Sequence, residues 1–172
     1  APYASAFYPN VVPPLDLVIV GDRIYTTDGD TAAPASFLVE WSRTTLLVVA
    51  VYPISDGGSV VAPQTVARFV YDPFSDRLWG SGFAFVGTPG VVRLTRNGVI
   101  DFIEPGFLAI SHMLIDQERH VGFMGIIDLG LGASFVAAFD TANPRMIASS
   151  FVSRGASPYG TNSIPTSLLL VK

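Results

Sequence analysis

The stretch "FVYDPFSDRLW", residues 69–79, places two apolar runs on either side of a short polar segment that contains Asp72 and Pro73. Three other stretches have the same form: "LVEWSRTTLLV" (38–48), "MLIDQERHVGF" (113–123) and "AAFDTANPRMI" (137–147). Apolar runs rich in β-branched and aromatic residues, separated by a few turn-forming residues, are typical of antiparallel β-hairpins. The four stretches therefore predict an all-β chain built from hairpins.

Charges support two of these hairpins. Asp72 precedes Arg77 by five residues, and Asp140 precedes Arg145 by the same distance. At this spacing the two charges are expected to face each other across a tight turn. The acidic positions 40, 72, 116 and 140 are separated by 32, 44 and 24 residues, which is too irregular to indicate a sequence repeat.

A fifth hairpin is predicted in "VVRLTRNGVIDFI", residues 91–103. Asn97 and Gly98 lie between two apolar runs, and both residue types adopt positive φ readily. We expect a two-residue type I′ turn at these positions.

The rest of the chain continues the pattern of short apolar runs separated by Gly, Pro, Asp and Asn. Residues 1–15 contain four prolines and are expected to form an extended arm ahead of a single β domain, 16–172. Residues 154–165 are expected to be a surface loop. The predicted strands are 16–20, 23–27, 36–42, 45–52, 66–71, 77–86, 90–95, 99–103, 107–115, 120–127, 133–140, 145–153 and 166–171.

The simplest architecture for this many short strands is an antiparallel β-sandwich or barrel, with a jelly-roll-like arrangement as one form. The turn phrases "YDPFSDRLW" and "FDTANPRMI" also resemble the inner hairpins of β-propeller blades. A chain of this length could supply about four blades of four strands at most. The alternative fold is therefore a set of propeller-like blades completed by oligomerisation.

The amino-acid composition limits the classes of function that the chain can have. The chain has 172 residues, of which 49% are hydrophobic and only 14% charged, with a mean hydropathy of +0.46. Such an apolar surplus favours association with other copies. The net charge of −4 and the scattered arginines argue against nucleic-acid binding. No membrane span is expected, because Asp128 interrupts the longest apolar stretch, residues 121–139.

The chain has no cysteine, which excludes disulfides and zinc–thiolate sites. It begins with Ala, so a processed product is expected, secreted or virion-associated, and the compartment is otherwise undetermined.

"HMLIDQERH", residues 112–120, contains both histidines of the chain. On a helix, His112, Asp116 and His120 would share one face and could hold a metal or act as an acid–base pair. The neighbouring sequence favours a hairpin instead, in which residues 117–119 form the turn and Ile115 lies opposite His120. In a hairpin the three side chains separate, so they are only weak catalytic candidates.

Other polar groups are equally weak candidates. Asp28 and Asp30 flank Gly29 in a predicted loop, as in calcium loops, but no Glu closes the site and an ordinary Asp-Gly turn is favoured. Asp101 could complete a set with Ser81 and a histidine, although no nucleophile elbow is present. No cofactor is expected.

Aromatic residues are the candidate ligand contacts. Trp41, Tyr71 and Trp79 lie close to two predicted hairpins, where they could bind carbohydrate or form protein contacts. The alternative is ordinary core packing, which uses the same residue types.

The sequence thus favours a non-enzymatic structural or binding protein that acts as a homo-oligomer, such as a virion coat or surface-type domain or a lectin-like binder. The rival interpretation is a small β-barrel enzyme or carrier that encloses an apolar small molecule.

Overall fold

The computed structural model describes residues 11–12, 16–30, 35–55, 65–83, 90–109, 113–128 and 133–154. Every regular element in these ranges is a β-strand, and the ladders pair antiparallel, so the predicted all-β class is confirmed. None of the described residues form a helix long and apolar enough to span a membrane. The predicted surface loop 154–165, beyond Arg154, and the predicted strand 166–171 lie outside the described residues.

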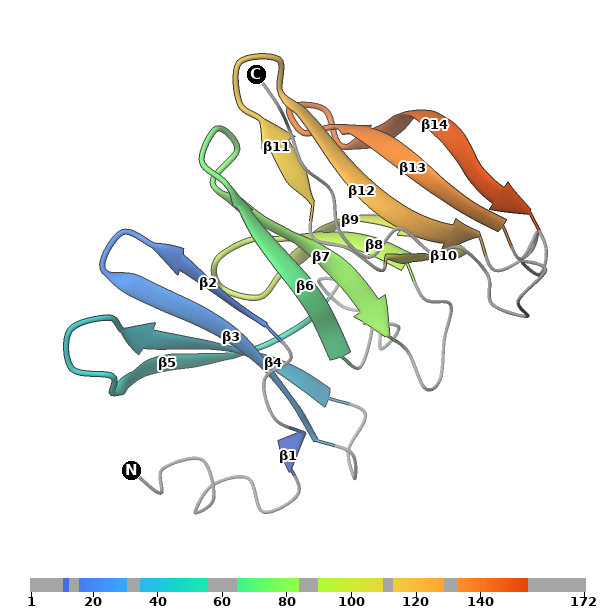
Figure 1. Ribbon diagram of the computed structural model, residues 1–172. Coiled ribbons are helices and arrows are strands. Elements are labelled where there is room, and N and C mark those ends of the chain that lie inside the picture. The colour runs from blue at the N-terminus through green and yellow to red at the C-terminus, as the bar shows by residue number, and fades with distance from the viewer. Residues whose placement is uncertain are drawn as a thin grey trace.

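The strands form three antiparallel sheets that follow one another along the chain (Figure 1). The first sheet contains β1 (Val11–Val12), β2 (Leu17–Val20), β3 (Arg23–Asp30), β4 (Ala35–Ser42) and β5 (Val48–Pro53). The second contains β6 (Thr65–Asp72), β7 (Arg77–Phe83), β8 (Gly90–Leu94) and β9 (Ile100–Pro105). The third contains β10 (Phe107–Ala109), β11 (Leu114–Asp116), β12 (Val121–Asp128), β13 (Ala133–Asp140) and β14 (Arg145–Arg154).

Each sheet is a meander with four strand positions. In the first sheet, β1 and β2 pair with successive parts of β3, so they share one position. In the third sheet, β10 and β11 share the edge of β12 in the same way. The predicted strand 107–115 is therefore two strands. Within the predicted arm, Val11 and Val12 pair with β3.

The second sheet packs against a neighbour on both of its faces. Adjacent residues of one strand contribute to two separate cores, because successive side chains of a strand point to opposite faces. The core shared with the first sheet includes Val20, Tyr25, Leu38, Phe69, Leu78, Val92 and Leu94. The core shared with the third sheet includes Trp79, Val91, Met124, Ile126, Ala137 and Phe139.

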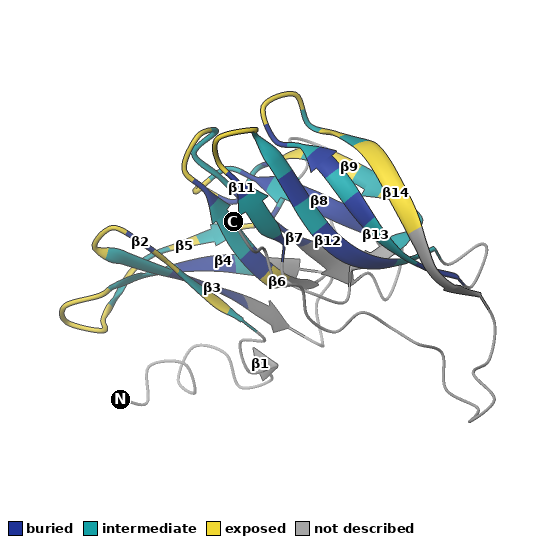
Figure 2. Cartoon of the chain, turned by 45° about the horizontal axis from the view of Figure 1, so that its top comes forward, coloured by how far each residue is buried: buried dark blue, intermediate teal, exposed yellow. Residues whose placement is uncertain are grey.

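The prediction of a sandwich or barrel is therefore wrong, and the alternative of propeller-like blades describes the arrangement better. A sandwich buries one face of each sheet, whereas here the middle sheet is covered on both sides (Figure 2). The sequence of β8 allows this, since Val91 and Val92 are adjacent and both almost completely buried.

A bulge in β6 helps to supply both cores. Ala67 pairs with Ser81 and Val70 with Trp79, so two residues of β6 lie opposite one residue of β7. Arg68, the first of the two, has a φ of 58°. Phe69 then turns toward the first sheet, while Val70 packs on the other core.

Four-residue turns close three of the predicted hairpins, and the carboxylate of the last strand residue caps each of these turns. Asp72 accepts hydrogen bonds from the Phe74 amide (3.1 Å) and the Ser75 hydroxyl (2.6 Å). Asp140 accepts from two backbone amides of its turn, at 3.0 and 2.9 Å. In the stretch 38–48 the capping residue is Ser42, whose Oγ accepts a hydrogen bond from the Thr45 amide.

The predicted charge pairs are only partly formed. Asp72 lies opposite Arg77 and Asp140 opposite Arg145, as expected. Asp140 and Arg145 are 3.9 Å apart, but Arg77 pairs with Asp101 instead of Asp72.

The Asn97–Gly98 hairpin is present with a different turn. Of these two residues only Gly98 has positive φ (83°), and Thr95 pairs with Val99 around a three-residue loop. The type I′ prediction is wrong because the Thr95 hydroxyl accepts a hydrogen bond from the Val99 amide, and the loop includes Arg96 as a third residue.

Residues 28–30 also differ from the prediction. They are not a turn, because β3 continues through Asp30 and pairs with Ala35–Phe37 of β4 and with β1.

Candidate functional site

The histidine stretch is a hairpin, as favoured, and not a helix. Its turn comprises residues 117–120, and Asp116 pairs with Val121. The expected register is wrong by two residues, since Ile115 pairs with Gly122 and not with His120. His120 belongs to the turn itself, with a φ of 54°, and His112 lies outside the described residues.

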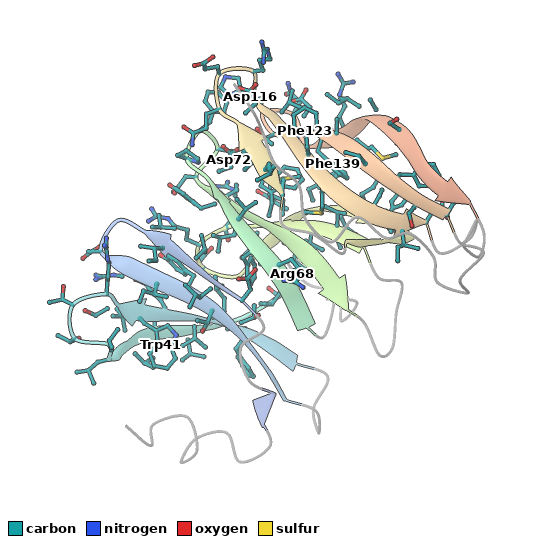
Figure 3. The ribbon with its side chains drawn as sticks, in the orientation of Figure 1. Trp41, Arg68, Asp72, Asp116, Phe123 and Phe139 are labelled. Atoms are coloured by element: carbon teal, nitrogen blue, oxygen red, sulfur yellow. The ribbon has the colours of Figure 1, made fainter. Side chains whose placement is uncertain are left out.

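Asp116 stabilises this turn. Its carboxylate accepts hydrogen bonds from the Glu118 and Arg119 amides at 3.2 and 3.3 Å, and from the Arg119 guanidinium at 2.8 Å. Burial alone would raise the pKa of this carboxyl, but the bonds from Arg119 hold the pKa below its usual value. Asp116 therefore acts as a charged cap (Figure 3).

His120 packs against the neighbouring sheet. Its ring lies 3.6 Å, centroid to centroid, from the ring of Phe74 in the β6–β7 turn. Its Nδ1 is buried without a hydrogen-bond partner among the described residues. The ring contact therefore connects the β11–β12 turn with the β6–β7 turn.

The other weak candidates are dispersed. Asp101 bridges Arg77 and Arg93 with two ion pairs of 2.7 Å. The side chains of Asp28, Asp30 and Ser81 lie outside the described residues. Within the described part of the chain, no group of three His, Cys, Asp or Glu side chains is close enough to hold a metal.

The three aromatic candidates have different environments. Trp79 is completely buried between the second and third sheets, with Phe102 at 5.6 Å and Phe139 at 6.0 Å. Tyr71 donates to Asp76 at 2.8 Å and packs on the core of the first and second sheets. Trp41 is partly exposed on the far side of the first sheet (Figure 3).

Trp41 belongs to an apolar surface that we call the outer face, formed by Leu17, Ile19, Trp41, Val49 and Val51. The exposed fractions are 57% for Leu17, 49% for Ile19, 49% for Val49 and 36% for Val51. Strand alternation places these residues opposite the side of the sheet that packs on the second sheet.

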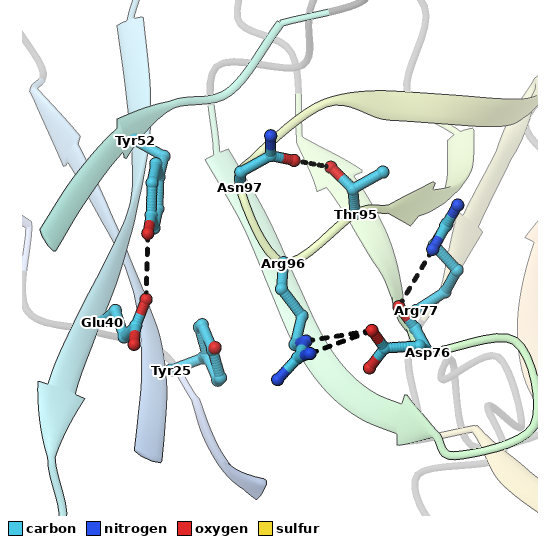
Figure 4. Close-up of a pocket in the computed structure, with 8 residues that line it drawn as sticks. All are labelled: Tyr25, Glu40, Tyr52, Asp76, Arg77, Thr95, Arg96 and Asn97. Atoms are coloured by element: carbon cyan, nitrogen blue, oxygen red, sulfur yellow. Dashed lines mark hydrogen bonds and ion pairs between the residues drawn. The ribbon is translucent and has the colours of Figure 1, made fainter.

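A pocket of about 380 Å³ lies between the first and second sheets. Strands β3, β4 and β5 supply one wall, and the β6–β7 and β8–β9 turns supply the other (Figure 4). We call it the interblade pocket, and it is lined by Tyr25, Glu40, Tyr52, Asp76, Arg77, Thr95, Arg96 and Asn97.

Hydrogen bonds fix the pocket walls. The Tyr52 hydroxyl donates to Glu40 at 3.0 Å, and Arg96 donates to Asp76 through two nitrogens at 3.2 and 3.0 Å. Burial raises the pKa of both Tyr25 and Tyr52 above the usual value of a tyrosine hydroxyl.

Gly98 allows the two walls to meet. A Cβ at this position would lie 2.9 Å from the Pro53 carbonyl oxygen and 3.2 Å from the Tyr52 Cβ. The close approach lets Ser55 donate its amide to the Gly98 carbonyl and accept from the Ile100 amide. The Asn97–Gly98 dipeptide thus lies at one edge of the pocket. The sequence alone gave no indication of a pocket there.

No protein-family model matches the sequence, and no curated protein is similar to it. Among solved structures, a europium-containing methanol dehydrogenase is similar over 78% of this chain, with a TM-score of 0.51 and 10% sequence identity. The three sheets resemble β-propeller blades. This chain matches only 33% of the length of that enzyme, and at this identity the likeness concerns the fold alone.

Proposed function

We propose that this chain is a non-enzymatic structural or binding protein that acts as a homo-oligomer, in which blades of one copy continue the blade stack of another. The observation that carries the proposal is the exposed apolar outer face. Large apolar residues exposed together on one surface of a soluble domain are typical of interaction sites.

The stacking of the sheets indicates what would cover this face. The second sheet is stable with both faces against neighbouring blades, whereas the first sheet has a neighbour on one face only among the described residues. A blade of a second copy offers a surface of the same kind. Propellers usually contain four to eight blades, so two copies of three blades would make a ring within that range.

The third sheet provides the complementary surface. Ala138 and Ala148 pair with each other and alternate with the buried Ala137 and Phe139, so they lie on the side away from the second sheet. Joining this side to the outer face of another copy is a head-to-tail contact, which generates a closed ring when the rotation allows it.

The rival interpretation, a carrier for an apolar molecule, has less support. The sheets stack and their shared cores are filled by side chains, while the interblade pocket is open and polar.

The experiment is native mass by light scattering over a wide concentration range. We expect twice the 18.3 kDa of one chain. Val49→Lys places a charge on the outer face and Ala148→Lys places one on the third sheet; each should weaken association by tenfold or more. Ala142→Lys is the matched control, since Ala142 is exposed in the β13–β14 turn.

Mixing the two variants separates the possible contacts. In a head-to-tail assembly, Val49→Lys retains an intact third sheet and Ala148→Lys an intact outer face, so the mixture should form mixed dimers. A strictly monomeric wild-type chain would overturn the proposal. The head-to-tail geometry would be overturned if mixed dimers did not form and the Ala148→Lys variant still dimerised.

A further inference from the structure

We propose that the interblade pocket binds a small, neutral, polyhydroxylated ligand of the size of a monosaccharide. This inference is independent of the proposed oligomer, because one chain supplies every residue of the pocket. Its volume of about 380 Å³ lies within the range of sites for small ligands.

The charge balance of the lining selects a neutral ligand. Two carboxylates, Glu40 and Asp76, are balanced by two guanidinium groups, Arg77 and Arg96. An anion entering the pocket would approach both carboxylates, and a cation would approach both arginines. A neutral molecule avoids the repulsion between like charges in both cases.

The lining offers donors and acceptors close together, as hydroxyl groups require. The Asn97 side-chain oxygen is hydrogen-bonded to Thr95, and no hydrogen bond from its amide nitrogen is found within the described part of the chain. Among the described residues, one oxygen of Glu40 is paired with Arg23 and the other with Tyr52, and each oxygen can accept a second bond. A ligand hydroxyl could accept from Asn97 while another donates to Glu40.

The walls are also held in place before a ligand arrives. Arg23 holds Glu40 at 2.7 Å, and Tyr71 and Arg96 hold Asp76 at 2.8 and 3.0 Å. The partly exposed phenol ring of Tyr52 adds apolar surface against which the C–H groups of a sugar ring can pack. Such preorganisation reduces the entropy lost on binding.

The test is saturation-transfer NMR with glucose, galactose and N-acetylglucosamine as probes, each raised to about 50 mM, at which a pocket with a millimolar Kd is largely occupied. Choline and methyl phosphate, which both carry C–H protons that the experiment can observe, are the charged comparison probes. We expect at least one neutral sugar to bind and both charged probes to fail.

Two variants and a control locate the binding. Asn97→Ala and Tyr52→Phe each remove a polar group, and each should weaken sugar binding by about five- to tenfold. Asn143→Ala is the control, because Asn143 is an exposed turn residue of the third sheet outside the pocket, and it should leave binding unchanged. Failure of all three sugars to bind would overturn the proposal. So would preferential binding of choline or methyl phosphate, or sugar binding that neither pocket variant weakens.

Discussion

Asp72 should contribute more to stability than Asp140, although both cap turns of the same length. The Asp72 side chain is completely buried and accepts bonds from the Phe74 amide and the Ser75 hydroxyl. Hydrogen bonds to a charged group contribute about 1.5–3 kcal/mol each, and part of that loss is recovered where water can replace the carboxylate. We therefore expect Asp72→Ala to lower the free energy of unfolding by about 2–4 kcal/mol.

Asp140→Ala is the matched comparison. Asp140 accepts two backbone bonds of similar length, but its partners are exposed and water can replace the carboxylate. A loss of about 1 kcal/mol is expected. The loss in free energy of unfolding for Asp72→Asn should lie between the losses for the two alanine variants, since the amide oxygen can still accept a hydrogen bond from the Phe74 amide.

Urea unfolding followed by circular dichroism measures these differences, with all variants at one protein concentration because the proposed association would contribute to apparent stability. Equal losses for Asp72→Ala and Asp140→Ala would refute the reasoning that burial of the cap sets its contribution.

Two further predictions concern close packing and pH. A Cβ at Gly90 would lie 2.6 Å from the backbone oxygen of Glu104, whereas a Cβ at Gly122 would meet the flexible end of Met113 at 2.6–3.0 Å. Gly90→Ala should therefore cost about 1–3 kcal/mol in unfolding free energy and Gly122→Ala clearly less; a reversed order of melting temperatures would contradict this. Because the pKa of Asp116 is lowered in the folded state, its stabilising effect is present at neutral pH and is lost as the pH falls through that value. In acid titrations of stability, Asp116→Asn should show a shallower loss than the wild type, and parallel curves would count against the charged cap.

The hairpins could be predicted because their signals are local. Asp72, Asp116 and Asp140 each stand at the last strand residue before a turn, and their side chains bond to amides two or three residues further on. Such chemistry depends on a few consecutive residues and is visible without the fold. The turn at Asn97 was misassigned because Thr95, just outside the dipeptide, supplies an additional cap.

The structural repeat was hidden because the turns occupy two different places in the sheets. Asp72 and Asp116 both precede the turn of the first hairpin of a sheet and are 44 residues apart, while Ser42 and Asp140 both precede the turn of the last hairpin. In chain order, a turn of a last hairpin at Ser42 is followed by two turns of first hairpins, at Asp72 and Asp116, and then by a turn of a last hairpin at Asp140. The uneven spacing therefore reflects mixed positions in a repeated four-strand unit and does not exclude the repeat.

The interblade pocket could not be predicted, because its walls join residues far apart in the chain. Tyr25 and Glu40 belong to the first sheet and Arg96 to a turn of the second. Their meeting depends on how two sheets pack, which in turn depends on side chains of both cores. No local pattern in the sequence indicates that these residues lie close together.

The high apolar content has two sources, which only the structure separates. Part of it is internal, because a middle sheet covered on both faces needs apolar residues at successive positions. That part alone would not require a partner. However, the remaining apolar surface is uneven: six of the nine exposed large apolar residues in the described ranges belong to the first sheet or its β4–β5 turn. An internal surplus would leave exposed residues scattered, so their concentration on one terminal blade favours association at that blade.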